Sequence, residues 1–402
     1  MKGLSAAISG TSLFGKAKSM VNRRTLVLAG AAALLGGCQV IPKTAEPTTN
    51  IPEATPTPEP SATALPTDAT RHRVALLVPM AGNTGAVGQS LANATTMALI
   101  DTNANNLRIT TYDTSRGAAA AARRAIADGN RLILGPLLAE NVPAVQAAAR
   151  PAGVPAIAFS NDTSVASSDV FVMGHIPEQS INRSIRYARQ RGASSFAALL
   201  PEGDYGQRSY SALTNSIREH GGTLTAFERY ARGNTSIVSA AQRLKSRGGY
   251  DTVLIADGAR LAVRAAGELK QDANPRLLGT ELWSGESALT RSSAINGALF
   301  SAVSDRRFRR FSDSYEARFG GKPYRIATLG YDSVLLTLRV ARDWRIGNRF
   351  PKSQLYDRGG FLGVDGPFRF GRNGVVERAL EVREVRGDQV VAVDAAPTSF
   401  GN

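Results

Sequence analysis

The sequence predicts an α/β protein with two doubly wound, Rossmann-like lobes and a cleft between them. From residue 71 onwards, short and almost wholly apolar runs alternate with amphipathic segments, in two successive series. Runs of this kind are typical of parallel strands that helices cover on both faces. Hydrophobic residues make up 43% of the 402 residues, which is enough for two cores of ordinary domain size.

The first series predicts most of lobe 1. Strands are expected at 73–79, 107–113, 131–134 and 154–160, and helices at 89–102, 117–128 and 140–150. A helix between two parallel strands implies a right-handed crossover. Later helical segments at 305–319 and 325–343 complete the lobe. We assign residues 71–175 and 304–347 to it.

The second series predicts lobe 2. Strands are expected at 194–201, 222–230 and 250–257, and helices at 178–191, 206–219, the stretch up to Arg247, and 259–270. Three late segments alternate apolar and polar residues, as antiparallel edge strands do: 368–370, 379–385 and 389–394. We assign residues 176–303 and 348–402 to this lobe. The predicted cleft lies between the carboxyl ends of strands from both lobes.

The first 38 residues have the pattern of a bacterial lipoprotein signal peptide. Thirteen uncharged residues, 25–37, follow an arginine pair and end in Leu-Gly-Gly before Cys38, which resembles a lipobox. An uncleaved membrane span is the alternative, but the apolar run is shorter than the roughly 20 residues that a bilayer requires. We therefore expect a lipidated Cys38 and an exported chain. Either Met1 or Met20 can be the start.

Residues 39–70 predict a disordered tether. The segment is rich in Pro, Thr and Ala without an apolar period, so it cannot bury enough surface to fold. Its 32 residues would span roughly 30 Å as a coil or on the order of 100 Å as polyproline II. Gln39 rather than an acidic residue follows the cysteine, which favours retention in the outer membrane over the inner one. The predicted location is the periplasm.

Composition excludes several kinds of site. Cys38 is the single cysteine and the three histidines lie far apart, so we expect no disulfide, no metal and no cofactor. The formal net charge is +15, of which the signal supplies five, and the rest has 43 basic against 33 acidic residues. In an exported protein this balance would attract anionic lipid headgroups or acidic polymers, and it does not suggest a nucleic-acid partner. Surface Arg and Lys most often form a solvated face, however, which is the interpretation that we favour.

Glycines at the first strand–helix junction admit two interpretations. Gly82, Gly85 and Gly88 precede a helix, and Asp113 ends the next strand, as in a dinucleotide site. The spacing is GxxGxxG rather than GxGxxG, and nicotinamide cofactors are scarce outside the cytoplasm. We therefore expect a tight turn in which Gly82 lines the cleft.

Polar and aromatic residues follow several predicted strands, where doubly wound sheets bind ligands. Turn and cap hydrogen bonds explain the cluster 160–162 equally well, and Trp283 fits a core position as well as a ligand contact. The candidate ligand-binding residues are Gly82, Leu138, Ala139, Ser160, Asn161, Asp162, Tyr205 and Trp283.

No catalytic set is evident in the sequence. It has no carboxylate pair spaced for acid–base hydrolysis and no serine in a GxSxG elbow. The helix expected at 305–319 has an aromatic core face, and its arginines form either a solvated flank or a face for an acidic partner. We therefore expect a binding protein and not an enzyme.

Four segments resemble the penicillin-binding-protein activator lipoproteins of bacteria. They are RVALLVPMAGNTGAVGQSLANATTMAL, LILGPLLAENVPAV, LLPEGDYGQRSYSALTNSIREHGGTL and ATLGYDS. The wider group has the type I periplasmic binding fold and is similar to leucine/isoleucine/valine-binding proteins. The last segment of that group is resembled here by FLGVDGPFRFGRNGVVERALEVREV. The resemblance implies a periplasmic, outer-membrane lipoprotein that binds and stimulates a peptidoglycan synthase. Residues 39–70 occupy the place of the helical-repeat domain of the best-known activators.

The alternative is a solute-binding receptor of an amino-acid ABC transporter. The resemblance implies that such receptors hold the ligand with hydroxyl residues of lobe 1 and an acid of lobe 2. Here Leu138 and Ala139 stand where hydroxyl residues are expected, and 296–305 has no acid near 298–300. An unmatched buried charge costs several kcal/mol, so a zwitterion is disfavoured. A small cleft ligand, either an amino acid or a peptidoglycan fragment, stays open.

Overall fold

The computed structural model of the chain describes residues 70–232, 236–271 and 274–400. The predicted signal peptide, with Cys38, and all but the last residue of the predicted tether lie outside the described residues.

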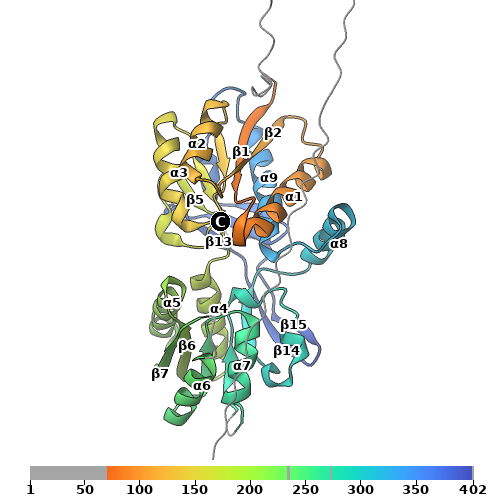
Figure 1. Cartoon of the computed structure of the whole chain (residues 1–402). Helices are drawn as coiled ribbons and strands as arrows, with labels where there is room; N and C mark the ends of the chain where they lie inside the picture. The colour runs from red at the N-terminus through yellow and green to blue at the C-terminus, as the bar shows by residue number, and fades with distance from the viewer. Residues whose placement is uncertain (1–69, 233–235, 272–273, 401–402) are drawn as a thin grey trace, which may run out of the picture. The chain divides into compact units, whose positions relative to one another are not determined.

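Lobe 1 contains a parallel five-stranded sheet in the order β2-β1-β3-β4-β5 (Figure 1). The strands are β1 (His72–Val78), β2 (Leu107–Asp113), β3 (Leu132–Leu134), β4 (Ala156–Ala158) and β5 (Val170–Val172). The helices of this lobe are α1 (Gly85–Asp101), α2 (Ala118–Ala127), α3 (Val142–Ala149), α8 (Phe308–Phe319) and α9 (Thr328–Ala341). The four strands expected at 73–79, 107–113, 131–134 and 154–160 are confirmed.

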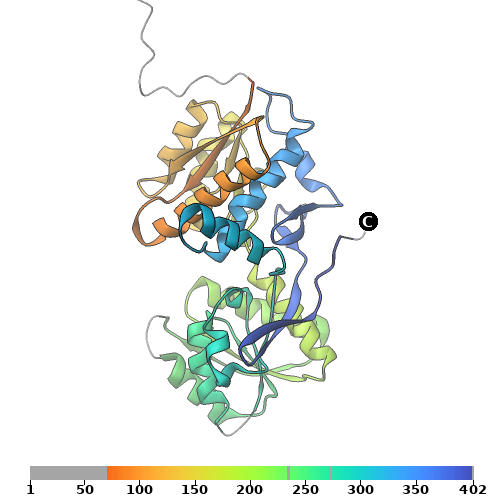
Figure 2. The same cartoon turned by 90° about the vertical axis from the view of Figure 1, so that its right-hand side faces the viewer.

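Alternate residues of β1 explain why its sequence is apolar throughout. Val74 and Leu76 belong to the core that includes residues of α1 and α9, which lie side by side on one face of the sheet (Figure 2). Ala75 and Leu77 belong to the core on the other face, under α2 and α3. Since successive side chains of a strand point to opposite faces, a strand covered on both faces must be apolar at every position.

Lobe 2 contains a seven-stranded sheet in the order β15-β14-β10-β9-β8-β6-β7. The strands are β6 (Ser195–Pro201), β7 (Thr223–Tyr230), β8 (Thr252–Ile255), β9 (Arg276–Leu278), β10 (Leu299–Ala302), β14 (Glu381–Arg386) and β15 (Gln389–Asp394). The first five are parallel, whereas β14 pairs antiparallel with both of its neighbours, as the late alternating segments predict. Helices α4 (Pro177–Gln190) and α5 (Asp204–His220) cover one face, and α6 (Ser236–Arg247) and α7 (Ala259–Leu269) cover the other.

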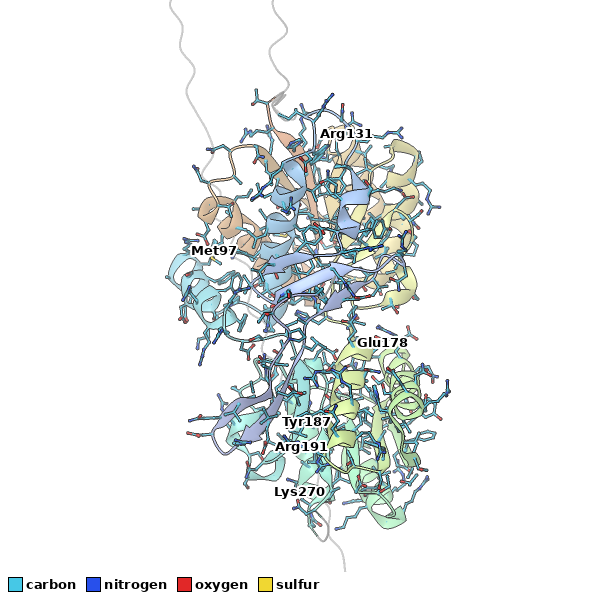
Figure 3. The ribbon with its side chains drawn as sticks, turned by 180° about the vertical axis from the view of Figure 1, so that it is seen from behind. Met97, Arg131, Glu178, Tyr187, Arg191 and Lys270 are labelled. Carbon is cyan, nitrogen blue, oxygen red and sulfur yellow. The ribbon has the colours of Figure 1, made fainter. Side chains whose placement is uncertain are left out.

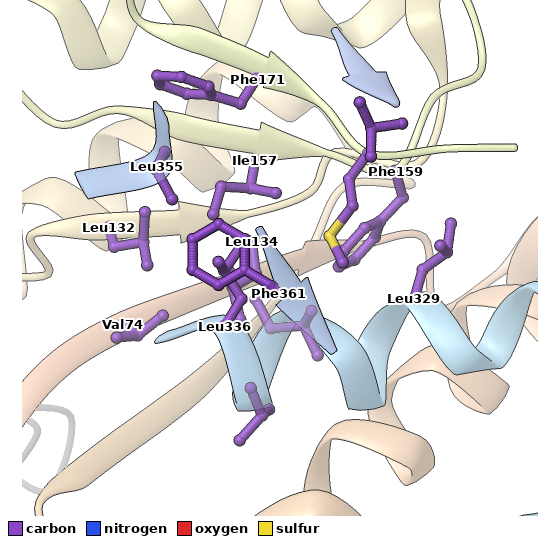
Figure 4. Packing of buried hydrophobic residues seen from close by; sticks show 14 of the residues in the cluster. Val74, Leu132, Leu134, Ile157, Phe159, Phe171, Leu329, Leu336, Leu355 and Phe361 are labelled. Carbon is purple, nitrogen blue, oxygen red and sulfur yellow. The ribbon is translucent and has the colours of Figure 1, made fainter. Parts of the chain in front are cut away.

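The late antiparallel hairpins are divided between the lobes, which differs from the predicted boundary at residue 348. Strands β11 (Phe361–Gly363), β12 (Gly366–Phe370) and β13 (Val376–Arg378) form a separate sheet. Its buried aromatic residues join the core of lobe 1, where Phe361 lies among residues of β3, β4 and β5 (Figure 4). Only β14 and β15 join the sheet of lobe 2. The aromatic residues fix this division because they complete the lobe-1 core.

The chain passes between the lobes three times, at 173–176, 303–307 and 379–380. Two arginines beside the third crossing hold carbonyl groups of the other two. Arg378 Nη2 donates to Met173 O at 2.6 Å, and Arg383 Nη2 donates to Val303 O. All three crossings are therefore tied together by charge-assisted hydrogen bonds.

A buried carboxylate, Asp365, lies beside these crossings. It accepts hydrogen bonds from Arg325 Nη1 at 2.7 Å and Thr328 Oγ1 at 2.9 Å, and its Oδ2 lies 2.7 Å from His175 Nε2. Burial alone would raise the pKa of Asp365, but Arg325 and His175 hold that pKa well below its ordinary value. The group is thus an anion inside the protein, and its neighbours are the partners that such a charge requires.

Replacing Phe368 with Ala tests the position of the β11–β13 sheet. The Phe368 side chain is 1% exposed, so its truncation should lower the free energy of unfolding by about 3–5 kcal/mol. The two tryptophans report on the lobes separately by fluorescence, because Trp344 lies in the core of lobe 1 and Trp283 in that of lobe 2. We expect the urea transition reported by Trp344, in a Trp283→Phe background, to shift the most.

The matched control is Leu362→Ala in the same sheet, where the side chain is 56% exposed. Its free energy of unfolding should change by no more than about 0.5 kcal/mol. A Phe368→Ala shift seen mainly by Trp283, in a Trp344→Phe background, would contradict the assignment of this sheet to lobe 1.

Candidate functional site

The candidate site lies where the carboxyl ends of strands from both lobes carry polar loops. Ser160 to Asp162 follow β4 of lobe 1, Tyr205 lies in the first turn of α5 after β6, and Thr280 and Glu281 follow β9. Gly279, which begins the last of these loops, shows how closely the chain packs here. A Cβ atom at Gly279 would lie 2.2 Å from the Trp283 ring.

One arginine joins the two lobes at this place. Arg208 of α5 donates from Nε to Glu178 Oε1 and from Nη2 to Glu178 Oε2, each at 2.8 Å. The same Nη2 donates to the carbonyl of Asn161 in lobe 1 at 2.6 Å. Glu178 is in the first turn of α4 and is labelled in Figure 3. A bidentate arginine–carboxylate pair is both strong and directional, so the Arg208 bridge defines how Asn161 faces lobe 2.

Tyr205 forms a second polar group with Thr280 and Glu281. Its hydroxyl lies 2.9 Å from Thr280 Oγ1 and donates to Glu281 Oε1 at 3.0 Å. The Glu281 residue is half-buried as a whole, but Oε2 is shielded from solvent and has no hydrogen-bond partner among the described residues. Burial, with a smaller contribution from the negative charge of Glu178, raises the pKa of Glu281 to about 8. Glu281 is therefore a neutral acid near pH 7.

One space adjoins the Arg208 bridge, and another adjoins Glu281. An open pocket of about 250 Å³ lies between α4 and α5, and Glu178, Asn182, Gln207, Arg208 and Asn215 are among its lining residues. A much smaller cavity of about 10 Å³, close to the volume that one water centre needs, is lined by Glu281 together with His175 and Arg378 of the crossings.

Other predicted residues make local contacts of their own. Asp162 Oδ1 accepts from both the backbone N and the Oγ of Ser164, and Ser160 Oγ accepts from the backbone N of Asp162. These bonds match the turn-and-cap interpretation of 160–162. Leu138 packs against the core of lobe 1, and Ala139 begins a 3-10 turn.

Of two further predicted residues, Gly82 is exposed to solvent and Trp283 is buried. Gly82 begins a 3-10 turn at φ 73°, and a Cβ atom there would meet open space. Trp283 is fully buried: its indole N–H donates to Asp257 O at 2.9 Å and its ring packs against Phe300. Of its two sequence interpretations, the core position is the one that the structure has, because its ring fills the lobe-2 core and its polar atom is already satisfied.

Glu281 is the residue that the sequence analysis missed. The expected place of a lobe-2 acid is near 298–300, whereas Glu281 lies two residues before Trp283. The usable signal was the apolar run that ends at Leu278, because β9 places the next residues at the sheet edge. Asn161, Tyr205 and Glu281 lie at this edge. Trp283 ends the 3-10 turn that begins at Glu281, but its side chain fills the core, and Gly82 and Leu138 lie in the loops after β1 and β3.

The arrangement offers hydrogen-bond donors, one neutral acid and an internal ion pair. Within residues 70–232, 236–271 and 274–400, no three His, Asp or Glu side chains come together in a way that could hold a metal ion. Over the same residues, none of the helices combines the length and the apolar character that a membrane crossing requires.

The raised pKa of Glu281 predicts a pH dependence of stability. Because its folded pKa of about 8 exceeds the ordinary 4.5, the folded chain holds a proton that the unfolded chain releases. The contribution of this proton to the free energy of unfolding is fully present below about pH 4.5. It is lost as the pH rises towards 8, by up to about 1.4 kcal/mol per pH unit. Glu281→Gln removes this titration. In urea unfolding, the variant should gain stability relative to the wild type as the pH rises.

Glu202→Gln, at an exposed position, is the matched control for the loss of one carboxyl group. A difference between Glu281→Gln and the wild type that stays constant from pH 5 to pH 8 would mean that Glu281 is ionised throughout this range.

Comparison with known proteins identifies the family. The family model described as "Periplasmic binding protein" matches residues 72–389. A putative branched-chain amino acid ABC transporter from Rhodospirillum rubrum is 19% identical, with a TM-score of 0.71 over 80% of this chain and 100% of that one. Leucine binding protein LivK from Thermotoga maritima is 19% identical, with a TM-score of 0.63 over 82% of this chain and 99% of that one.

Two further proteins are similar to the chain. A solute binding protein from R. palustris, solved with benzoate, is 17% identical, with a TM-score of 0.64 over 83% of this chain and 98% of that one. The uncharacterized protein RP748 of Rickettsia prowazekii is 27% identical over 175 residues, which are 43% of this chain and 47% of that protein. The match thus spans about half of the curated relative. From the extent of the family match and the two-lobed fold, the chain belongs to the periplasmic binding proteins and has their type I fold.

Proposed function

We propose that this chain is a lipid-anchored, non-catalytic periplasmic regulator that binds and stimulates a penicillin-binding protein. The observation that carries the proposal is the Arg208 bridge. In a solute receptor, a small ligand supplies contacts that hold two lobes together. Here Arg208, Glu178 and Asn161 supply such contacts from the protein itself.

The charges at the bridge are also balanced without a ligand. The Arg208 guanidinium is paired with both oxygens of Glu178, and Glu281 is neutral near pH 7. A zwitterion needs one free cation and one free anion from the protein, because an unmatched buried charge is costly. Two segments resemble the activators. GDYGQR contains Arg208 of the bridge, and GPLLAENV, which contains Asn141, lies in lobe 1. They support a synthase as the partner.

Direct assay with a purified bifunctional penicillin-binding protein tests the proposal. The chain from Gln39 onwards should bind the synthase and increase its rate of glycan polymerisation several-fold. Arg208→Ala should weaken this stimulation, because it releases Asn161 from lobe 2. Arg243→Ala is the matched control, since Arg243 pairs with Glu228 elsewhere on lobe 2. Absence of both binding and stimulation would overturn the proposal.

A solute receptor is the second candidate, and Glu281 is the observation that favours it. Its Oε2 is buried without a partner among the described residues, beside the Tyr205 hydroxyl. A neutral acid of this kind can donate to a ligand carboxylate, or lose its proton to become the partner of an ammonium group. The ligand would be a small acid, an amino acid or a peptidoglycan fragment.

Thermal-shift measurements separate the two candidates. Under the receptor hypothesis one amino acid, aromatic acid or muropeptide should raise the melting temperature by several degrees, and Tyr205→Phe with Glu281→Gln should abolish the rise. Under the regulator hypothesis none of these compounds shifts the wild-type chain, while the synthase does.

The anchor has its own test at Cys38. Cys38→Ala removes the thiol that would carry the lipid, so labelling with a fatty-acid analogue should disappear and the chain should move from the membrane to the soluble fraction. A Thr25→Ser variant, also inside the predicted signal and downstream of both candidate starts, should leave labelling and fractionation unchanged. Membrane retention of a processed but unlabelled Cys38→Ala chain would contradict the anchor.

A further inference from the structure

The amino-terminal edge of the lobe-1 sheet, opposite the candidate site, is lined with arginines. Arg73 of β1 stands in parallel register with Arg108 of β2. Arg131, immediately before β3, donates its backbone N–H to the carbonyl of Arg73 at 3.0 Å and is labelled in Figure 3. Three neighbouring strands therefore begin with a cationic side chain at the same edge.

The loop after α9 adds three more arginines to this edge. The Trp344 ring stacks on His72 at the start of β1, with centroids 4.1 Å apart, which fixes the loop beside the strand starts. The guanidinium carbon of Arg349 lies 3.3 Å from the position of a Cβ atom at Gly153, just before β4. We call the set Arg73, Arg108, Arg131, Arg342, Arg345 and Arg349 the basic edge. The last three and Arg131 are exposed.

Within the part of the chain that the structure describes, nearby acids do not neutralise the exposed arginines of the basic edge. Asp101 pairs with Arg318 at 2.6 Å, while the Asp128 carboxylate, which accepts a hydrogen bond from the Tyr112 hydroxyl at 2.8 Å, offsets one of the six arginines. Asp343 is the one acid between residues 342 and 349, against three arginines. A net positive field therefore extends from this edge into solvent.

Exposed apolar side chains accompany the arginines. Ile346, between Arg345 and Arg349, is 46% exposed, and Ile100 at the end of α1 is 61% exposed. Trp344 and Phe350 are buried beneath the loop and pack edge-on at 5.2 Å, so they hold the loop in place. An apolar tip flanked by arginines on a fixed loop combines the two attractions of an interfacial membrane contact, apolar insertion and anionic headgroup binding.

We infer that the basic edge docks on an anionic phospholipid surface. The first described residue, Thr70, precedes β1, so the 69 preceding residues join the folded chain at this same edge. A lipid anchor at Cys38, within those residues, would raise the effective concentration of headgroups at the basic edge, because the second contact with the membrane is then intramolecular. The inference goes beyond the proposed function, and it holds for either the regulator or the receptor.

Vesicle co-sedimentation of the unlipidated chain from Gln39 onwards tests the inference. This chain keeps all described residues, and omitting the lipid separates failure of the docking from failure of the anchor. It should bind vesicles of phosphatidylglycerol and phosphatidylethanolamine at least about tenfold more tightly than phosphatidylcholine vesicles. Binding should be lost near 1 M salt, where the Debye length is about 3 Å.

Two charge-reversal variants locate the contact. Arg342→Glu with Arg345→Glu and Arg349→Glu should weaken binding to anionic vesicles by about tenfold or more. The control carries the same charge change at three exposed positions, one just before α8 and two within it: Arg306→Glu, Arg309→Glu and Arg310→Glu. Ile346→Ser, which keeps the charge, should weaken vesicle binding several-fold.

Circular dichroism melting accompanies each variant. If the arginines serve only the carboxyl ends of the lobe-1 helices, the first triple variant would melt earlier and bind vesicles like the wild type, which overturns the inference. Equal losses in both triple variants would overturn it as well. Binding to soluble polyglutamate as tight as to vesicles, with no effect of Ile346→Ser, would assign the basic edge to an acidic protein instead.

Discussion

The structure depends on the arginine contacts that tie the three interlobe crossings together. Arg378 reaches the carbonyl of Met173, Arg383 reaches that of Val303, and Asp365 supplies a buried anion beside them. Each of these groups is costly to bury alone, and removing one partner of a buried pair typically costs about 3–5 kcal/mol. These contacts lie where residues 348–402 divide between the lobes, since the chain leaves β13 at Arg378 and enters β14 at Glu381.

The candidate site is connected to these crossings. Glu281 lines the same 10 Å³ cavity as His175 and Arg378, so a change in the charge of the site acid occurs next to groups that hold the lobes. Beside the same crossings, the Asp332 carboxylate accepts the backbone N–H of Val364 at 2.6 Å, and burial together with the charge of Asp365 raises the pKa of Asp332 above its ordinary value.

The sequence predicted the parallel strands of both lobes well, since strands covered on both faces must be apolar at every position. It did not predict the short strands β5, β9 and β10, which have three, three and four residues; β9 and β10 also contain Arg276 and Ser301. The lobe boundary failed because Phe361, Phe368 and Phe370 look like any amphipathic hairpin until their three-dimensional neighbours are known. Glu281 was missed for a related reason: the short apolar run that ends at Leu278 was not interpreted as a strand, so the residues after it were not placed at the sheet edge.

A parallel sheet separates two kinds of surface within lobe 1. Its carboxyl edge presents the loops of the candidate site, whereas its amino edge receives the ends of α1, α2 and α9 and collects the arginines that such helix ends favour. Residues 1–69 precede β1 in the chain and so connect to lobe 1 at the amino edge. Under the proposed docking of the amino edge on a membrane, the site loops of lobe 1 would point away from the lipid, because a parallel sheet has its carboxyl ends on the opposite edge. The common direction of the strands therefore keeps the basic edge and the candidate site on opposite sides of lobe 1.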